Sequence, residues 1–148
     1  MLSVFANPVL WSGLIAWALA QALKVPLDYL RSGAWHWHLL LEAGGMPSSH
    51  SAFIVAIAHS IGLSTGFGTP LFALAFGMAV IVVYDATGIR RQTGIHAELL
   101  NIMLHDLATG HPLKNQRVRE VFGHTPLEAL AGVLLGLAVA QGVWILWN

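Results

Sequence analysis

Residues 51–84 read SAFIVAIAHSIGLSTGFGTPLFALAFGMAVIVVY, a stretch that contains no Asp, Glu, Lys or Arg. Its 34 residues are too many for one membrane crossing, which takes about 20 apolar residues. Residues 62–70, GLSTGFGTP, interrupt it with turn formers and end in a proline, which is favoured at the start of a helix. The stretch therefore predicts a helical hairpin with arms near residues 51–64 and 70–84, each short for a full crossing.

Two more uncharged stretches lie outside the hairpin, at residues 1–23 and 129–148, and each is long enough for one spanning helix. The chain is 56% hydrophobic and 9% charged, whereas an ordinary soluble domain is roughly 25% charged. A chain of 148 residues has room for one domain. We therefore expect an all-α integral membrane protein, a single membrane-embedded domain over residues 1–148 with about four transmembrane helices.

The charge balance and the absence of cysteine exclude several classes of function. Seven basic and seven acidic residues cancel, so the basic surface that binds DNA or RNA is missing and no nucleic-acid partner is expected. Without cysteine the chain has no disulfide framework, no thiolate nucleophile and no cysteine-ligated zinc.

The charged residues fall into two windows, residues 24–42 and 85–128. With four crossings, both windows emerge on one face of the membrane, and the termini and the glycine-rich turn emerge on the other. Because every Lys and Arg then lies on one face, the positive-inside tendency predicts that this face is cytoplasmic. Four apolar residues at helical spacing in the second window predict an amphipathic interfacial helix: Ile95, Leu99, Ile102 and Met103.

Two candidate anion-binding elements come first in the chain. Lys24 and Arg31 are seven residues apart, which returns them to within about 20° of one helix face, so both can point at one anion. The alternative is that both snorkel to lipid headgroups. In GGMPSSHS at residues 44–51, Ser48, Ser49 and the following helix N-terminus can cradle an anion, with His50 placed to give or take a proton. The alternative is an ordinary helix cap.

Two further elements lie in the second charged window. Arg90 and Arg91 can clamp a phosphate, or they only mark the membrane exit. His124 and Glu128 are four residues apart, so the carboxylate can accept from one imidazole nitrogen and leave the other free to attack. The competing interpretation makes Glu128 part of a capping box with Thr125. All four elements lie on one predicted face, and together they favour phosphoryl transfer through a histidine intermediate.

These residues resemble the three-part signature of the type 2 phosphatidic acid phosphatases, relatives of the vanadium haloperoxidases. That signature reads Lys-x6-Arg-Pro, Pro-Ser-Gly-His and Ser-Arg-x5-His-x3-Asp. The pattern of the whole chain, with Gly-Gly-Met-Pro-Ser-Ser-His-Ser-Ala, Tyr-Asp-Ala-x-Gly-x-Arg-Arg and Gly-His-Thr-Pro-x-Glu, is more similar to the divergent PAP2 family over nearly its full length. The resemblance implies a PAP2-like helical bundle.

The resemblance also implies a role for each candidate. His124 would be the nucleophile, Glu128 would orient it, and His50 would protonate the leaving group. Six residues would bind phosphate: Lys24, Arg31, Ser48, Ser49, Arg90 and Arg91. No metal or other cofactor is expected, because the spacing of the Asp and His residues matches no particular metal site.

Three departures from the signature stand beside these roles. Ser32 replaces the proline of the first motif, Ser49 replaces a glycine, and over thirty residues separate the arginine pair from His124. His96 has the signature's spacing from Arg90 and is a rival nucleophile, but Leu100 stands where its acid should be. His124 is favoured because Glu128 follows it.

The sequence therefore predicts a membrane lipid phosphate or pyrophosphate phosphatase, an enzyme that is independent of metal. The alternative is a non-catalytic membrane module that binds anionic headgroups. His59, in the middle of an apolar arm, is expected to be a hydrogen-bonded interior histidine. Gly132 and Gly136 have the spacing for close helix packing, either within the chain or between subunits of a homo-oligomer.

Overall fold

The computed structural model describes residues 5–41, 44–87, 96, 99–105, 107 and 124–147. These residues form four long helices and one short 3-10 helix: α1 (Pro8–Ser32), η2 (Trp37–Leu40), α2 (Ser49–Thr65), α3 (Pro70–Thr87) and α5 (Pro126–Trp147). Residues 99–105 are also helical, as the apolar spacing predicts, and Leu99, Ile102 and Met103 are exposed. The all-α fold expected from the composition is thus confirmed.

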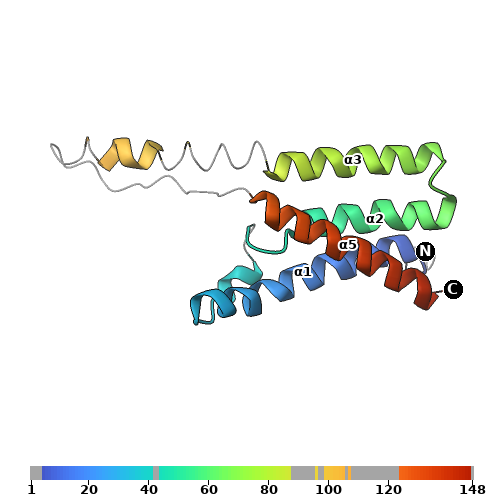
Figure 1. Ribbon diagram of the computed structural model, residues 1–148, viewed down its shortest axis with the longest axis horizontal. Coiled ribbons are helices and arrows are strands. Elements are labelled where there is room, and N and C mark those ends of the chain that lie inside the picture. The colour runs from blue at the N-terminus through green and yellow to red at the C-terminus, as the bar shows by residue number, and fades with distance from the viewer. Residues whose placement is uncertain are drawn as a thin grey trace.

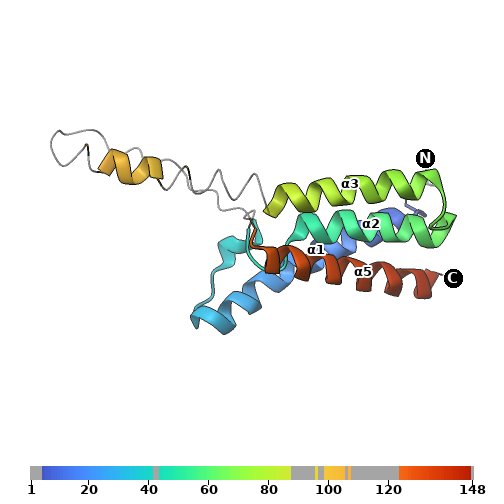
Figure 2. The same ribbon diagram turned by 45° about the horizontal axis from the view of Figure 1, so that its top comes forward.

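Three of the long helices, α1, α3 and α5, are long and apolar enough to cross a membrane. The sequence predicted about four crossings, and α2 accounts for the difference. It has 17 residues, one fewer than α3, and it is less apolar because it carries polar residues such as His50, His59 and Ser60. α2 is nevertheless the central helix, because α1, α3 and α5 all pack against it (Figures 1 and 2).

Small residues make the contacts at the centre of the bundle. Ala16 and Ala20 of α1 meet Ala52 and Ala56 of α2 in a cluster with Ala140 of α5, and all five are fully buried. Large apolar side chains such as those of Leu74 and Ile81 point outward and are more than half exposed. This arrangement is typical of helices in lipid, where close backbone approach drives association and the hydrophobic effect does not.

The Gly132 and Gly136 pair packs within the chain. A Cβ atom on Gly132 would lie 2.3 Å from the Ser48 carbonyl oxygen, and one on Gly136 would lie 2.6 Å from that of Ala52. Both glycines therefore let α5 approach the backbone of α2 closely. The sequence leaves open whether these glycines pack within the chain or between subunits, and this contact lies within the chain.

The two ends of the bundle are formed by different segments of the chain, as the charge pattern predicts. Both termini and the α2–α3 turn lie at one end (Figure 1). The C-terminal ends of α1 and α3, the loop before α2 and the start of α5 lie at the other end (Figures 1 and 2). The segments that carry the candidate site residues of known position are therefore at one end of the molecule.

Candidate active site

The serine loop, residues 44–48, is fixed at the start of α2 by the Ser48 side chain. Ser48 Oγ accepts a hydrogen bond from the Ser51 backbone N–H at 3.3 Å and one from the Ser51 hydroxyl at 3.1 Å. The Ser48 N–H donates to the Glu128 carbonyl at 2.9 Å, which ties the loop to α5. Ser48, Ser49 and Ser51 are all buried. Ser48 is thus the N-cap of α2.

Lys24 is buried beside this loop, with only 2% of its surface exposed. The backbone of Gly45, at a φ of +79°, passes its stem, since a Cβ on Gly45 would be 3.8 Å from Lys24 Cδ. Its positive charge acts on His124. A buried lysine next to a histidine is not snorkelling toward headgroups.

Arg31, one residue from the end of α1, is exposed. Its Nη2 donates to the Met46 sulfur at 3.3 Å. The two cations of the first motif therefore separate, because Lys24 lies inside the bundle and Arg31 lies at its surface against the serine loop.

His124 lies immediately before α5 and is 4% exposed. Its backbone N–H donates to the Ala86 carbonyl at the end of α3 at 3.0 Å. Its Nδ1 is 3.5 Å from Glu128 Oε2 and has no hydrogen-bond partner among the residues that the structure describes. The distance of 3.5 Å between Nδ1 and Oε2 thus fits an ion pair and is longer than that of a good hydrogen bond.

Glu128 also forms the capping box with Thr125. Its Oε2 accepts from the Thr125 N–H at 2.9 Å, and Thr125 Oγ1 accepts from the Glu128 N–H at 3.3 Å. The same carboxylate oxygen therefore caps α5 and faces the His124 imidazole. The capping box is therefore present, and the His124 imidazole lies beside the same carboxylate without a hydrogen bond to it.

His50 is the second residue of α2, and its exposed side chain faces His124. The centres of the two rings are 6.4 Å apart, with 55° between their planes. We call these two residues the histidine pair. They come from segments far apart in the sequence, and the Ser48 to Glu128 hydrogen bond holds those segments together.

His96 and His59 are not part of this cluster. Arg90 and Arg91 lie outside the described residues. His96 is exposed, and the helical residues 99–105 that follow it stand apart from the bundle in both views (Figures 1 and 2). His59 Nε2 lies 3.4 Å from Gln141 Oε1 on α5, which fits the expected hydrogen bond, although His59 is only half-buried.

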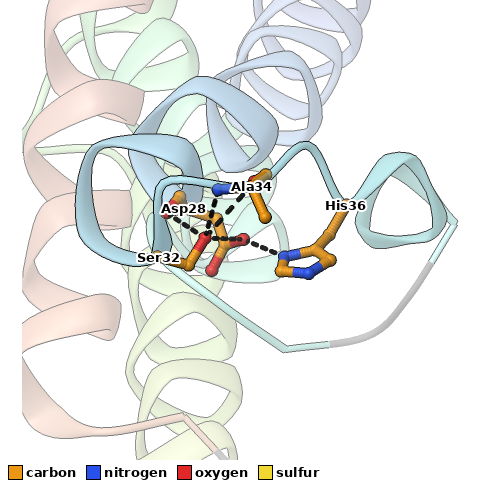
Figure 3. A network of polar contacts seen from close by, with 4 residues as sticks. All are labelled: Asp28, Ser32, Ala34 and His36. Atoms are coloured by element: carbon orange, nitrogen blue, oxygen red, sulfur yellow. Dashed lines mark hydrogen bonds and ion pairs between the residues drawn. The ribbon is translucent and has the colours of Figure 1, made fainter.

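One polar cluster at the end of α1 was not predicted from the sequence. Asp28 Oδ2 lies 2.7 Å from His36 Nδ1 and 3.3 Å from Ser32 Oγ, and the Ser32 hydroxyl also accepts from the Ala34 N–H (Figure 3). These contacts fold the segment after α1 back onto the helix. The signal that was available is the spacing of Asp28 and Ser32, four residues apart on one helix face.

Burial lowers the pKa of His124 below its ordinary value of about 6.5, because burial disfavours the charged imidazolium. The Glu128 carboxylate opposes this shift, while the positive charges of His50 and Lys24 add to it. A lower pKa keeps the imidazole neutral over more of the pH range, and the neutral form is the nucleophile.

These causes predict how the His124 pKa responds to substitution. Glu128→Gln removes the charge that favours imidazolium, so the pKa should fall further. His50→Ala removes a competing positive charge, so the pKa should rise. NMR titration of the histidine ring protons in detergent measures both changes, with Asp28→Asn as a control that leaves His124 unaffected. Shifts of the opposite sign would contradict the observed arrangement.

Comparison with known proteins gives a consistent result. The model of the family described as the divergent PAP2 family matches residues 5–139. The chain is 36% identical over 154 aligned positions to an uncharacterized membrane protein of Bacillus subtilis (strain 168), YuiD, and the alignment covers 94% of this chain and 98% of that protein. No solved structure matches the chain.

Proposed function

The chain belongs to the divergent PAP2 family, and from this premise we propose that it is a membrane phosphatase that removes phosphate from a lipid phosphate or pyrophosphate. The observation that carries the proposal is the approach of His50 and His124, with 6.4 Å between ring centres, beside the buried Lys24. An exposed histidine and a buried histidine at one site can divide the roles of general acid and nucleophile.

The first chemical step forms a phosphohistidine. The neutral His124 imidazole attacks phosphorus through Nε2, and the bond from phosphorus to the lipid oxygen breaks. His50 gives its proton to the departing oxygen. Glu128, 3.5 Å from Nδ1, stabilises the positive charge that develops on the ring.

The second step releases inorganic phosphate. His50, now neutral, removes a proton from water, and the water oxygen attacks phosphorus while the bond to Nε2 breaks. Both residues return to their starting protonation states. The negative charge of the phosphoryl oxygens is stabilised by Lys24 and by the positive end of the α2 dipole behind Ser48 and Ser49. Arg31, Arg90 and Arg91 complete the proposed phosphate-binding set.

The site lies at the end of the bundle where the charged windows emerge, so the headgroup meets it at the membrane surface while the lipid chain stays in the bilayer. Because all seven Lys and Arg residues belong to these windows, we propose that this face is cytoplasmic.

Phosphate release tests the proposal. Protein purified in detergent is incubated with phosphatidic acid, a prenyl phosphate and a prenyl diphosphate, and free phosphate is measured. Release from at least one substrate is expected, and rapid quenching with labelled substrate should trap an acid-labile phosphoprotein. No release and no labelled protein with any of the three would reject the phosphatase proposal.

One observation favours a second candidate, a module that binds anionic headgroups without turnover. Glu128 Oε2 is closer to the Thr125 N–H, at 2.9 Å, than to His124 Nδ1, at 3.5 Å, so the cap competes for the carboxylate that the nucleophile needs. Saturable binding of orthovanadate or inorganic phosphate, reduced by Lys24→Met, together with no turnover of any lipid phosphate, would select this function.

A further inference from the structure

An apolar groove of about 580 Å³ lies between α3 and α5, with α2 as its floor. It exists because α3 and α5 both pack on α2 while they contact each other little. Ala58 on α2 and Ala79 on α3 are small, and Val83 and Val133 form facing walls. The groove is open on one side, and the helices that form it belong to the membrane-embedded bundle, so that side faces lipid.

One end of the groove adjoins the candidate active site. Tyr84 and Thr87, in the last turn of α3, line this end. Between them in the sequence, the Ala86 carbonyl accepts the backbone hydrogen bond of His124 at 3.0 Å. The groove therefore begins within one helical turn of Ala86, whose backbone carbonyl is hydrogen-bonded to the proposed nucleophile, His124. Along α3 it extends from Thr87 to Phe72, a distance of about 22 Å.

Aromatic rings lie at the other end. His59 and Phe72 line the groove there, and the Phe67 ring contacts both, at 5.6 Å from the His59 ring and 5.0 Å from the Phe72 ring. Phe67 lies on the bare backbone of Gly62, where a Cβ would come within 2.3 Å of its ring. Gln141 holds His59 from α5. This cluster of His59, Phe67 and Phe72 is a fixed obstacle.

Resting on the phosphatase function proposed above, we propose that this groove holds one hydrocarbon chain of the substrate lipid and that the His59, Phe67 and Phe72 cluster sets the longest chain that fits. A linear chain is the occupant because the groove is apolar, open to lipid, long along the bundle axis, and ends beside the backbone contact between Ala86 and His124.

The groove acts on selectivity more than on affinity. Lipid tails are as apolar as the groove lining, so moving a chain from the bilayer into the groove gains little hydrophobic free energy. The gain is positional, because a seated chain holds the phosphate at the histidine pair in an attack geometry. A chain that is too long for the groove displaces the phosphate from that position.

Alkyl phosphates of increasing chain length, from hexyl to eicosyl, test the inference. In the wild-type protein, kcat/KM should rise with length and then fall once the chain exceeds the groove. Val80→Trp narrows the groove about 10 Å along α3 from Thr87, so it should lower kcat/KM for dodecyl and longer chains about tenfold, because a chain stopped there no longer holds the phosphate in the attack geometry, and it should affect hexyl phosphate much less. Phe72→Ala opens the far end and should move the optimum to longer chains.

Ile81→Trp is the matched control. Ile81 is on the same helix, is 68% exposed and does not line the groove, so the same substitution there should leave the length profile intact. Val133→Phe fills the groove from the α5 side and replaces Val80→Trp if that variant unfolds. Equal losses for short and long chains in both groove variants, or the same loss in Ile81→Trp, would overturn the inference.

A photoactivatable alkyl phosphate with a terminal diazirine separates this inference from the phosphatase proposal, because its readout needs no turnover. Crosslinks to residues near Phe72 that hexadecyl phosphate competes away, and hexadecanol does not, are expected whether or not the protein hydrolyses the probe. Crosslinks that both compounds remove equally would show a bulk lipid chain, and absence of any crosslink near Phe72 would show that no chain enters the groove. Either result would reject the substrate groove, while absence of turnover alone would reject only the phosphatase.

Discussion

His124→Gln should reduce phosphate release by at least about a thousandfold, because it removes the proposed nucleophile while leaving a polar side chain of similar size. The variant should still fold, since the hydrogen bond from His124 to Ala86 uses the backbone N–H. Steady-state turnover of the best lipid substrate measures the loss, and the labelled phosphoprotein should disappear with it.

His96→Gln is the control for this prediction. His96 is exposed and belongs to the segment that stands apart from the bundle, so its replacement should leave turnover unchanged. Retained activity in His124→Gln together with lost activity in His96→Gln would transfer the nucleophile to His96. His50→Ala should slow both chemical steps, and its effect should be smaller for a leaving group that needs no proton.

Gly132→Val should give the largest loss of stability among single substitutions in α5. Its Cβ would lie 2.3 Å from the Ser48 carbonyl oxygen and 3.0 Å from Ser51 Cβ, and neither a backbone oxygen nor the capped serine can move aside easily. Overpacking of this kind costs about 1–3 kcal/mol or more. Thermal unfolding in detergent should show a large decrease in Tm, and activity should be lost with it.

Two other glycines of α5 provide a negative and a positive comparison for that loss. Gly142→Val changes the same residue type in the same helix, but beyond the neighbouring backbone of α5 no described atom lies within 4 Å of the point that its Cβ would occupy, so only the small helix penalty of valine remains. Gly136→Val should also destabilise, since its Cβ would lie 2.6 Å from the Ala52 carbonyl. Equal Tm values for the Gly132 and Gly142 variants would contradict the close contact between α2 and α5.

The sequence predicts the helices well because charge and turn residues mark where they end. The hairpin arms expected at residues 51–64 and 70–84 correspond to Ser49–Thr65 and Pro70–Thr87. Pro70 is the first helical residue, as expected, while the start of α2 moves to Ser49 because Ser48 caps it. The ends of α1 and α3 and the starts of α2 and α5 lie at one end because successive long helices run in opposite directions (Figures 1 and 2).

The sequence does not predict which faces of the helices meet. α3 and α5 are apolar on nearly every side, so the residue pattern carries no polar stripe from which a rotation about the helix axis can be inferred. The contact of Gly132 with Ser48 and the groove beside Val83 both depend on that rotation. The motif residues could be named as candidates, but their distances could not.

Glu128 shows a second limit of inference from residue patterns. The spacing of His124 and Glu128 and the spacing of Thr125 and Glu128 support different roles, and a pattern alone treats them as alternatives. In the structure one oxygen of Glu128, Oε2, accepts the hydrogen bond from the Thr125 N–H and also lies close to His124 Nδ1. The ordering of the two contacts, 2.9 Å and 3.5 Å, is a property of the folded chain.

Two hydrogen bonds described above, from the Ser48 N–H to the Glu128 carbonyl and from the His124 N–H to the Ala86 carbonyl, join three helices without using any side chain. Mutational drift at His124 therefore changes the chemistry of the site and leaves these two backbone hydrogen bonds intact. Inactive relatives with an unaltered architecture are an expected product of such drift, and dead variants of this protein are suitable baits for capturing its natural lipid.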